Sequence, residues 1–188
     1  MALVVGLTGG IGSGKSEALA AFARHGAVTL SSDEMVRELY LRDDVRRAVA
    51  DHFGPDALNA SGAVDRAAIA RRVFADEAER RWLEGLLLPL LAERFAEWKA
   101  ERLAGGDQLL VHEAPTLFEA GIADRYDMIV LVTAPEEVRE SRRPGAEERM
   151  RHQLPEAEKA ARSDIVYENT GTLEELDRWV AGLVARLT

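Results

Sequence analysis

The spacing of apolar residues changes along the chain between continuous runs and helical periodicity, and these changes predict its strands and helices. Ala2 to Thr8 is a continuous apolar run rich in valine and leucine, which is typical of a buried strand. Lys15 to His25 carries apolar residues at helical spacing, and Gly26 supplies a helix stop. Ala27 to Leu30 is a second apolar run. The order strand, helix, strand predicts the start of a parallel α/β sheet.

A long helical stretch follows the second predicted strand. Apolar residues recur there at helical spacing, and Gly-Pro and Ser-Gly pairs interrupt them. Because Pro89 falls inside the last segment, we expect that segment to be kinked or split at the proline. The predicted helices are Asp33–Leu39, Asp43–Phe53, Asp65–Phe74 and Glu77–Leu103. We interpret residues 33–104 as a helical insertion in the sheet domain.

Strand patterns return in the C-terminal half. Leu109–Glu113, Met128–Val132 and Ile165–Tyr167 are short apolar runs, and an arginine-rich stretch from Glu136 to Gln153 lies between the last two. The final segment, Thr172–Leu187, is predicted to be a helix. Its apolar face contains Leu173, Leu176, Trp179, Val180, Leu183 and Leu187.

Composition narrows the class of protein. A length of 188 residues suggests one domain, and the absence of cysteine excludes disulfides and thiolate chemistry and fits a reducing cytoplasm. The formal net charge of −9 argues against a nucleic-acid partner. No segment resembles a signal peptide or approaches the roughly 20 apolar residues that cross a bilayer. We therefore expect a cytoplasmic protein with no membrane association and no evident obligate protein partner.

The segment from Gly9 to Ser16, GGIGSGKS, matches the phosphate-binding pattern G-x-x-x-x-G-K-S/T between a strand and a helix. Its glycines let backbone N–H groups converge on phosphate oxygens at a helix N-terminus. Lys15 would reach the β- and γ-phosphates, and Ser16 would place its hydroxyl on Mg²⁺. A plain glycine-rich turn is the alternative, but it has no use for the lysine and the serine. The sequence predicts a nucleoside triphosphate with Mg²⁺ and a three-layer P-loop NTPase fold around a central parallel sheet.

The remaining motifs separate the classes of P-loop protein. GTPases read guanine with an N-K-x-D element, and neither Asn59 nor Asn169 begins one. The small size and the helical insertion favour a kinase that closes on a small acceptor and excludes water.

A set of short motifs recurs in order along almost the whole chain. Its members are Gly6–Ser16, Asp33, Phe53-Gly54, Gly62 with Asp65-Arg66, Val73-Phe74, Pro115 with Leu117-Phe118-Glu119, Gln153 with Lys159, and Asn169 with Gly171. In these residues the chain resembles the dephospho-CoA kinase family. The resemblance implies MgATP-dependent phosphorylation of the ribose 3′-hydroxyl of dephospho-CoA, giving coenzyme A and ADP. It also implies a single kinase domain with an acceptor-binding insertion and a short lid near residues 139–155.

The resemblance also implies roles for individual residues. Catalysis would fall to Lys15, Asp33 and Arg142, and the metal to Ser16. The implied ATP-binding residues are Gly10, Ile11, Gly12, Ser13, Gly14, Lys15, Ser16, Glu17, Asn169 and Gly171. The implied acceptor-binding residues are Asp33, Arg66, Pro115, Leu117 and Glu119.

Several of these residues also fit a purely structural role. Asp33 would orient the acceptor hydroxyl and take its proton, or would simply cap the helix that follows. Arg66 would hold acceptor phosphates or form a surface ion pair. Arg139, Arg142 and Arg143 would bring positive charge over the transferring phosphoryl group or would line a solvated helix. Glu113 ends the third strand, where P-loop enzymes often place a carboxylate that holds water around Mg²⁺.

The sequence departs from the family pattern at a few positions. Glu17 replaces a hydroxyl residue, and Ser31 stands at the first position of the family's D-x-D. Leu88 and Thr116 replace the more usual His and Leu, and the lid is short, so that a second lid arginine has no counterpart unless Arg143 or Arg149 substitutes. Two alternatives follow. One is a P-loop kinase for another small acceptor, such as a nucleoside or nucleotide, and the other is a weakly catalytic nucleotide-binding protein.

Overall fold

One parallel sheet organises the chain. The computed structural model describes residues 2–151 and 153–188. In the described residues, five strands pair in the order β2-β3-β1-β4-β5, and every pair is parallel. All five predicted apolar runs are confirmed as strands, with ends that move by at most one residue. The strands are β1 (Leu3–Thr8), β2 (Val28–Ser31), β3 (Leu109–Glu113), β4 (Met128–Thr133) and β5 (Ile165–Glu168).

The register brings the C-terminal ends of three strands into line. Glu113 of β3 lies opposite Leu7 of β1 on one side and opposite Ser31 of β2 on the other. His112, one residue earlier, lies between Gly6 and Leu30 in the same way. Ligands of open parallel sheets bind beyond this edge, so the register decides which side chains meet there.

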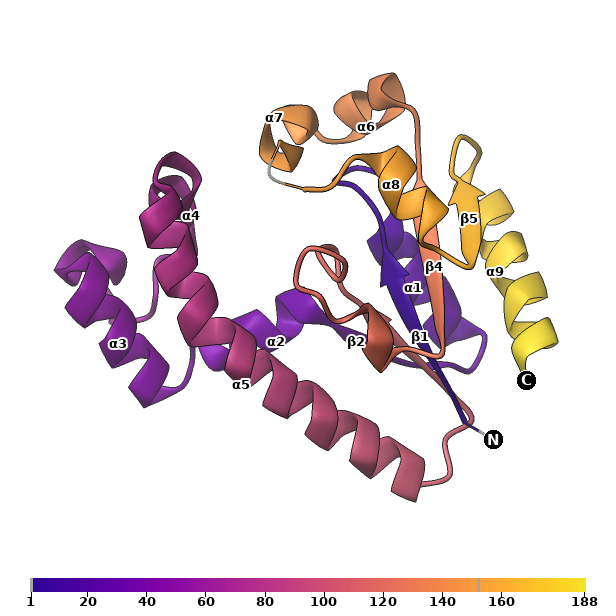
Figure 1. Ribbon diagram of the computed structural model, residues 1–188, viewed down its shortest axis with the longest axis horizontal. Helices are drawn as coiled ribbons and strands as arrows, with labels where there is room; N and C mark the ends of the chain where they lie inside the picture. The colour runs from indigo at the N-terminus through magenta and orange to yellow at the C-terminus, as the bar shows by residue number, and fades with distance from the viewer. Residues whose placement is uncertain (1, 152) are drawn as a thin grey trace. The chain divides into compact units, whose positions relative to one another are not determined.

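Two helices cover one face of the sheet. Figure 1 shows α1 (Lys15–Arg24) and α9 (Leu173–Leu187) on the same side of the strands. Phe22 of α1 and Leu176 of α9 are fully buried against Val5 and Val111 of the strands. The apolar face predicted for α9 is confirmed for most of its members, but Leu173 is 63% exposed. It is the first residue of α9, directly after the cap Thr172, so the buried part of this face begins only at Leu176.

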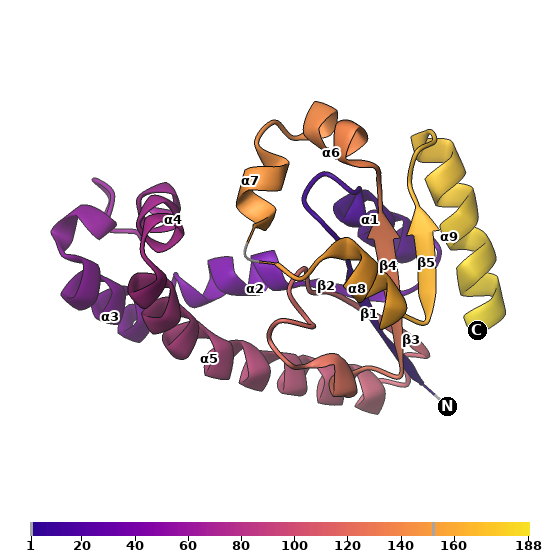
Figure 2. The same cartoon turned by 45° about the horizontal axis from the view of Figure 1, so that its top comes forward.

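The opposite face of the sheet carries α8 (Glu156–Ala161), which packs against β4 (Figure 2). The sheet therefore lies between two helical layers, as the three-layer prediction requires. The arginine-rich stretch after β4 forms α6 (Glu136–Arg142) and α7 (Ala146–Met150). A short 3₁₀ helix, η2 (Ala123–Arg125), precedes β4.

The chain divides into two compact units, residues 1–32 with 99–188 and residues 33–98. The first contains the sheet. The second has its own apolar core, in which Val49, Phe53 and Ile69 are buried, and His52 stacks on Trp82 with ring centroids 3.8 Å apart. Its elements are α2 (Ser32–Leu39), α3 (Asp43–Phe53), η1 (Pro55–Ala57), α4 (Arg66–Ala75) and α5 (Glu77–Ala104), of which α2 and α5 extend across the unit boundaries.

Pro89 does not split the last of these helices. Helix α5 runs without a break from Glu77 to Ala104 with Pro89 inside it, so the split is wrong, while the kink stays a prediction. Pro89 cannot donate to the carbonyl four residues earlier, which belongs to Gly85. Both residues are exposed and nothing lies within 4 Å of the site where Gly85 would carry a Cβ, so water can reach that carbonyl. Burial of Leu87 and Phe95 on the other side of the helix offsets the lost hydrogen bond.

Candidate active site

The glycine-rich segment forms the loop between β1 and α1. Gly14 is the N-cap of α1 in a left-handed conformation (φ 97°), and Lys15 is the first helical residue. Such a loop directs several backbone N–H groups and the positive end of the helix dipole into one small space. Lys15 is buried, and its ammonium group donates to the carbonyl of Gly10 at 2.7 Å. The lysine thus arches back over the loop that the phosphates of a nucleotide would enter.

A hydroxyl and a carboxylate meet next to this loop. The Ser16 hydroxyl donates to Oε1 of Glu113 at 3.4 Å, and the Ser31 hydroxyl donates to Oε2 of the same carboxylate at 3.2 Å. Glu113 is buried at the end of β3. Mg²⁺ prefers oxygen ligands and keeps most of its water, so it needs only one or two protein groups. The oxygens of Ser16 and Glu113 fit that requirement.

Asn169, directly after β5, supports the loop from the opposite side. Its side-chain amide is buried and donates to the carbonyl of Ser13 at 2.8 Å. A Cβ on Gly14 would collide with the same amide nitrogen, so this approach requires glycine at position 14. Gly171 follows beside the capping box that Thr172 and Glu175 form at the start of α9. Asn169 therefore contacts the phosphate loop directly.

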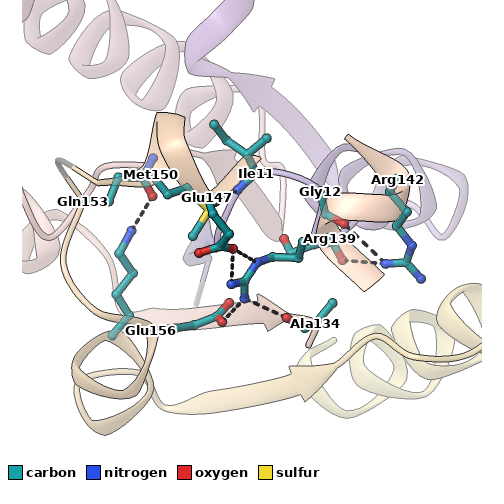
Figure 3. A network of polar contacts seen from close by, with 12 residues as sticks. Ile11, Gly12, Ala134, Arg139, Arg142, Glu147, Met150, Gln153 and Glu156 are labelled. Atoms are coloured by element: carbon teal, nitrogen blue, oxygen red, sulfur yellow. Dashed lines mark hydrogen bonds and ion pairs between the residues drawn. The ribbon is translucent and has the colours of Figure 1, made fainter. Parts of the chain in front are cut away.

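Arg139 of α6 is held in place by acidic neighbours. Its guanidinium forms ion pairs with Glu147 of α7 and Glu156 of α8 and donates to the carbonyl of Ala134 at 2.7 Å (Figure 3). The residue is 6% exposed. Burial opposes the charged form, but the contacts with Glu147 and Glu156 outweigh it and raise the pKa of Arg139. This arginine therefore joins α6, α7 and α8 in the described structure.

Arg142, one turn further along α6, has a different environment. It is exposed, and its Nη1 lies 3.4 Å from the carbonyl oxygen of Gly12 and 3.5 Å from that of Ser13 (Figure 3). These long contacts are weak, so the guanidinium can exchange them for a phosphate oxygen. Arg143 is also exposed, and the side chain of Arg149 lies outside what the structure describes.

Met150 lies over the loop. The backbone N–H of Ile11 donates to the sulfur of Met150 at 3.1 Å, and a Cβ on Gly10 would lie 2.8 Å from its terminal methyl carbon. Figure 3 shows the sulfur beside Ile11. Sequence reasoning missed Met150, and no motif in the sequence marks it.

The segment after β3 is joined to α8 through a buried lysine. Lys159 is 2% exposed and pairs with Glu119 at 2.8 Å. It also donates to Gln153 at 2.9 Å and to the carbonyl of Pro115 at 3.3 Å. The Glu119 carboxylate accepts from the backbone N–H of Leu154 at 2.8 Å, while Leu117 is fully buried in the interior. The family resemblance had already singled out Gln153 and Lys159 together, and the structure joins the two by a hydrogen bond.

Asp33 and Arg66 belong to the second unit. Helix α2 begins at Ser32, so Asp33 lies in its first turn and is not the cap that the structural alternative expected. Its side chain is exposed. Arg66 is the exposed first residue of α4, whose N-terminus is capped by the carboxylate of Asp65. The positive charge of Arg66 acts on Tyr40, whose pKa is nevertheless raised because burial dominates. Glu17 is exposed in the first turn of α1.

Two general features of the described residues bear on the site. No group of three histidine, aspartate or glutamate side chains there could enclose a metal ion. Among helices within residues 2–151 and 153–188, none combines the length and the apolar character needed to span a bilayer.

Comparison with known proteins gives a consistent family. The dephospho-CoA kinase family model matches residues 3–175. Dephospho-CoA kinase of Syntrophotalea carbinolica is 39% identical over 98% of this chain and 92% of its own length, and that of Geobacter sulfurreducens is 35% identical over 97% and 98%.

Solved structures agree with the fold. The crystal structure of a Thermus thermophilus protein is similar with a TM-score of 0.82 at 35% identity, covering 100% of this chain and 98% of that one. Dephospho-CoA kinase from Campylobacter jejuni has a TM-score of 0.68 at 18% identity, covering 98% and 97%, and shikimate kinase from Acinetobacter baumannii has 0.56 at 16%, covering 99% and 94%. These last two likenesses concern the P-loop kinase fold alone. By the family match and the identity with its relatives, the chain belongs to the dephospho-CoA kinase family.

Proposed function

We propose that this chain catalyses the reaction for which its family is named, the ATP-dependent phosphorylation of dephospho-CoA, at the ribose 3′-hydroxyl. The observation that carries the proposal is the family match over residues 3–175, which includes the complete phosphate loop. The comparisons contain nothing that favours another acceptor, and a buried loop lysine beside a serine and a glutamate is suited to phosphoryl transfer rather than to simple nucleotide storage.

The nucleotide lies along the glycine-rich loop in this proposal. Backbone N–H groups of residues 10–16 surround the phosphates, and Lys15 leaves the Gly10 carbonyl for a phosphate oxygen. Ser16 would hold Mg²⁺, and Glu113 would hold water around it. The ion would supply positive charge that neutralises charge developing on the β- and γ-phosphates. Asn169 holds the loop through its hydrogen bond to the Ser13 carbonyl. Gly171 and Glu17 border the bound nucleotide.

The acceptor side depends on Asp33. Its carboxylate orients the ribose 3′-hydroxyl and accepts the proton as the oxygen attacks the γ-phosphorus. The bond between that phosphorus and the β–γ bridging oxygen breaks, and ADP leaves. Arg142 exchanges its weak contacts with the loop carbonyls for the oxygens of the transferring group.

The remaining acceptor residues act through shape and charge. Arg66 binds acceptor phosphate with its guanidinium fork. Pro115 and Glu119 border the acceptor after β3, while the buried Leu117 supports them from the interior, and Lys159 ties both to α8. ATP and dephospho-CoA are the only partners that the proposal requires. The cytoplasmic location expected from the cysteine-free sequence stays a prediction.

A coupled assay of ADP release tests the proposal. The purified chain is supplied with MgATP and either dephospho-CoA or a panel of nucleosides and nucleotides, with Lys15→Ala as the inactive reference. We expect turnover with dephospho-CoA, and a product whose phosphate lies on the 3′-oxygen. Turnover with a nucleoside alone would identify a different acceptor, and ATP binding without turnover on any acceptor would favour a nucleotide-binding protein.

A further inference from the structure

The last two residues of β3 bind the two serines that precede Asp33. Glu113 accepts from the Ser31 hydroxyl at 3.2 Å, and His112 lies with Nε2 2.9 Å from the Ser32 hydroxyl. Successive residues of a strand point to opposite faces of the sheet, so the two contacts hold this short segment from both faces. Glu113 already has a place in the phosphate site, whereas the mechanism gives His112 none.

Both ring nitrogens of His112 lie within hydrogen-bonding distance of a hydroxyl although the residue is buried. It is 3% exposed, and its Nδ1 lies 2.8 Å from the hydroxyl of Tyr126. Burial, and secondarily the charge of Arg125, lower the pKa of His112 to about 4, so the ring is neutral near pH 7. A neutral imidazole has one donor and one acceptor nitrogen, and hydroxyls can take the complementary role at each. The ring thus links Tyr126 to Ser32 with both nitrogens used.

Tyr126 is itself fixed by packing. Its ring lies flat against Gly6 of β1, where a Cβ would be 2.9 Å from the ring carbon Cγ. The next residue, Asp127, binds the backbone of β1 in both directions, since its N–H donates to the Val4 carbonyl and its carboxylate accepts from the Val4 N–H, each at 2.8 Å. The hydroxyl that meets His112 therefore has a defined position relative to the sheet.

Tyr126 also lies next to the place where the chain returns to the sheet unit. The chain leaves that unit after Ser32 and returns to it at Lys99. The Lys99 ammonium group donates to the carbonyl of Arg125 at 3.3 Å. The segment where the chain leaves the sheet unit is tied to Tyr126 through His112. The segment where the chain returns is tied to Arg125 through Lys99. Because Arg125 and Tyr126 are adjacent, both segments are held at one place just before β4.

We propose that His112 is a positioning residue for phosphoryl transfer, which holds Ser32 and thereby fixes the point on the sheet unit from which Asp33 extends. The inference rests on the proposed role of Asp33 as the acceptor-side carboxylate. Reactions that depend on position lose rate when a reacting group is displaced by about 1 Å, without loss of substrate binding. A histidine that merely fills the core would instead affect folding stability and would leave turnover unchanged.

Three substitutions separate the two roles. Tyr126→Phe keeps the ring on Gly6 and removes the hydroxyl, His112→Leu removes both ring contacts, and His112→Gln keeps one donor and one acceptor. We expect kcat to fall by roughly threefold to tenfold for Tyr126→Phe and further for His112→Leu, with KM for ATP within about twofold and partial recovery in His112→Gln. Tyr167→Phe, which removes a hydroxyl from β5, is the matched control and keeps full turnover.

A double-mutant cycle and hydrogen exchange complete the test. In an Asp33→Asn background, His112→Leu is expected to change kcat by less than about twofold, because the group it positions is gone. Backbone amides of residues 29–36 are expected to exchange faster in His112→Leu without ligands. A lower Tm with unchanged kcat, an equal loss in both backgrounds, or unchanged exchange would each overturn the inference. Full kcat in Asp33→Asn alone would instead overturn the proposed role of Asp33, while the exchange measurement would still decide whether His112 anchors the segment.

Discussion

The sulfur of Met150 accepts a hydrogen bond from the backbone N–H of Ile11, 3.1 Å away, inside the loop proposed to bind phosphate. The thioether and an ATP phosphate oxygen would therefore compete for the same donor. A thioether is a weak acceptor, and a phosphate oxygen is a strong one. ATP would displace the Met150 sulfur, which lies beside Ile11 in Figure 3, and part of its binding energy would be spent on moving this side chain.

Replacing Met150 with alanine is accordingly expected to tighten ATP binding. Removal of the sulfur and of the methyl group beside Gly10 frees the loop before ATP arrives, and we expect Kd to fall by roughly threefold. Titration calorimetry with MgATP measures this change. Met150→Leu keeps most of the bulk and is expected to stay within about twofold of the parent. Weaker binding by Met150→Ala would mean that the side chain helps to hold ATP.

Substitution of the two arginines of α6 is expected to affect different properties, turnover for Arg142 and stability for Arg139. Arg142 is exposed and makes only long contacts with the loop, so Arg142→Gln is expected to lower kcat by roughly 10²-fold with a change in unfolding free energy below about 0.5 kcal/mol. Arg139 is buried between two carboxylates, so Arg139→Met is expected to cost about 3–5 kcal/mol. Steady-state kinetics and urea unfolding measure the two effects. If Arg142→Gln kept full kcat, another group would have to stabilise the transferring phosphoryl.

The residues of the phosphate loop could be predicted because they are neighbours in the sequence. Lys15 and Ser16 follow from a short pattern with fixed offsets, and the strand before it and the helix after it have strong periodicity. Glu113 was singled out because it ends the third strand, where P-loop enzymes often place a carboxylate that holds water around Mg²⁺. The structure brings this carboxylate to the Ser16 hydroxyl, and its role toward the metal stays a prediction.

Other features depend on contacts between distant segments and could not be predicted. Arg139 and Arg142 are both arginines of one charged stretch, and only the position of Glu147 and Glu156 in space decides which one is buried. The His112 contacts join three segments of no recognisable motif. Pro89 has a strong local tendency to end a helix, but burial along the rest of α5 overrides it.

Asp33→Asn tests the acceptor-side carboxylate. The amide keeps the size of the side chain but cannot accept the proton of the attacking hydroxyl, so kcat is expected to fall by roughly 10²–10⁴-fold. Because the proposed ATP site is the loop of the sheet unit, the Kd for ATP is expected to change by less than about twofold. Asp43→Asn, at the exposed start of α3, is the matched control. Unchanged turnover in Asp33→Asn would remove this residue from the mechanism.

The buried ion pair between Lys159 and Glu119 predicts an asymmetric effect on stability. In Lys159→Met the Glu119 carboxylate stays largely buried with its partner gone, and the free energy of unfolding is expected to fall by about 3–5 kcal/mol. Adding Glu119→Gln removes the unpaired charge, so the double variant is expected to be more stable than Lys159→Met. Urea unfolding measures both differences. The exposed pair of Glu158, on the same helix, and Arg162, the residue that caps it, is the control. Glu158→Gln is expected to change stability by less than about 0.5 kcal/mol. A double variant no more stable than Lys159→Met would mean that the lysine stabilises the fold through Gln153 and the Pro115 carbonyl instead of through the charge of Glu119.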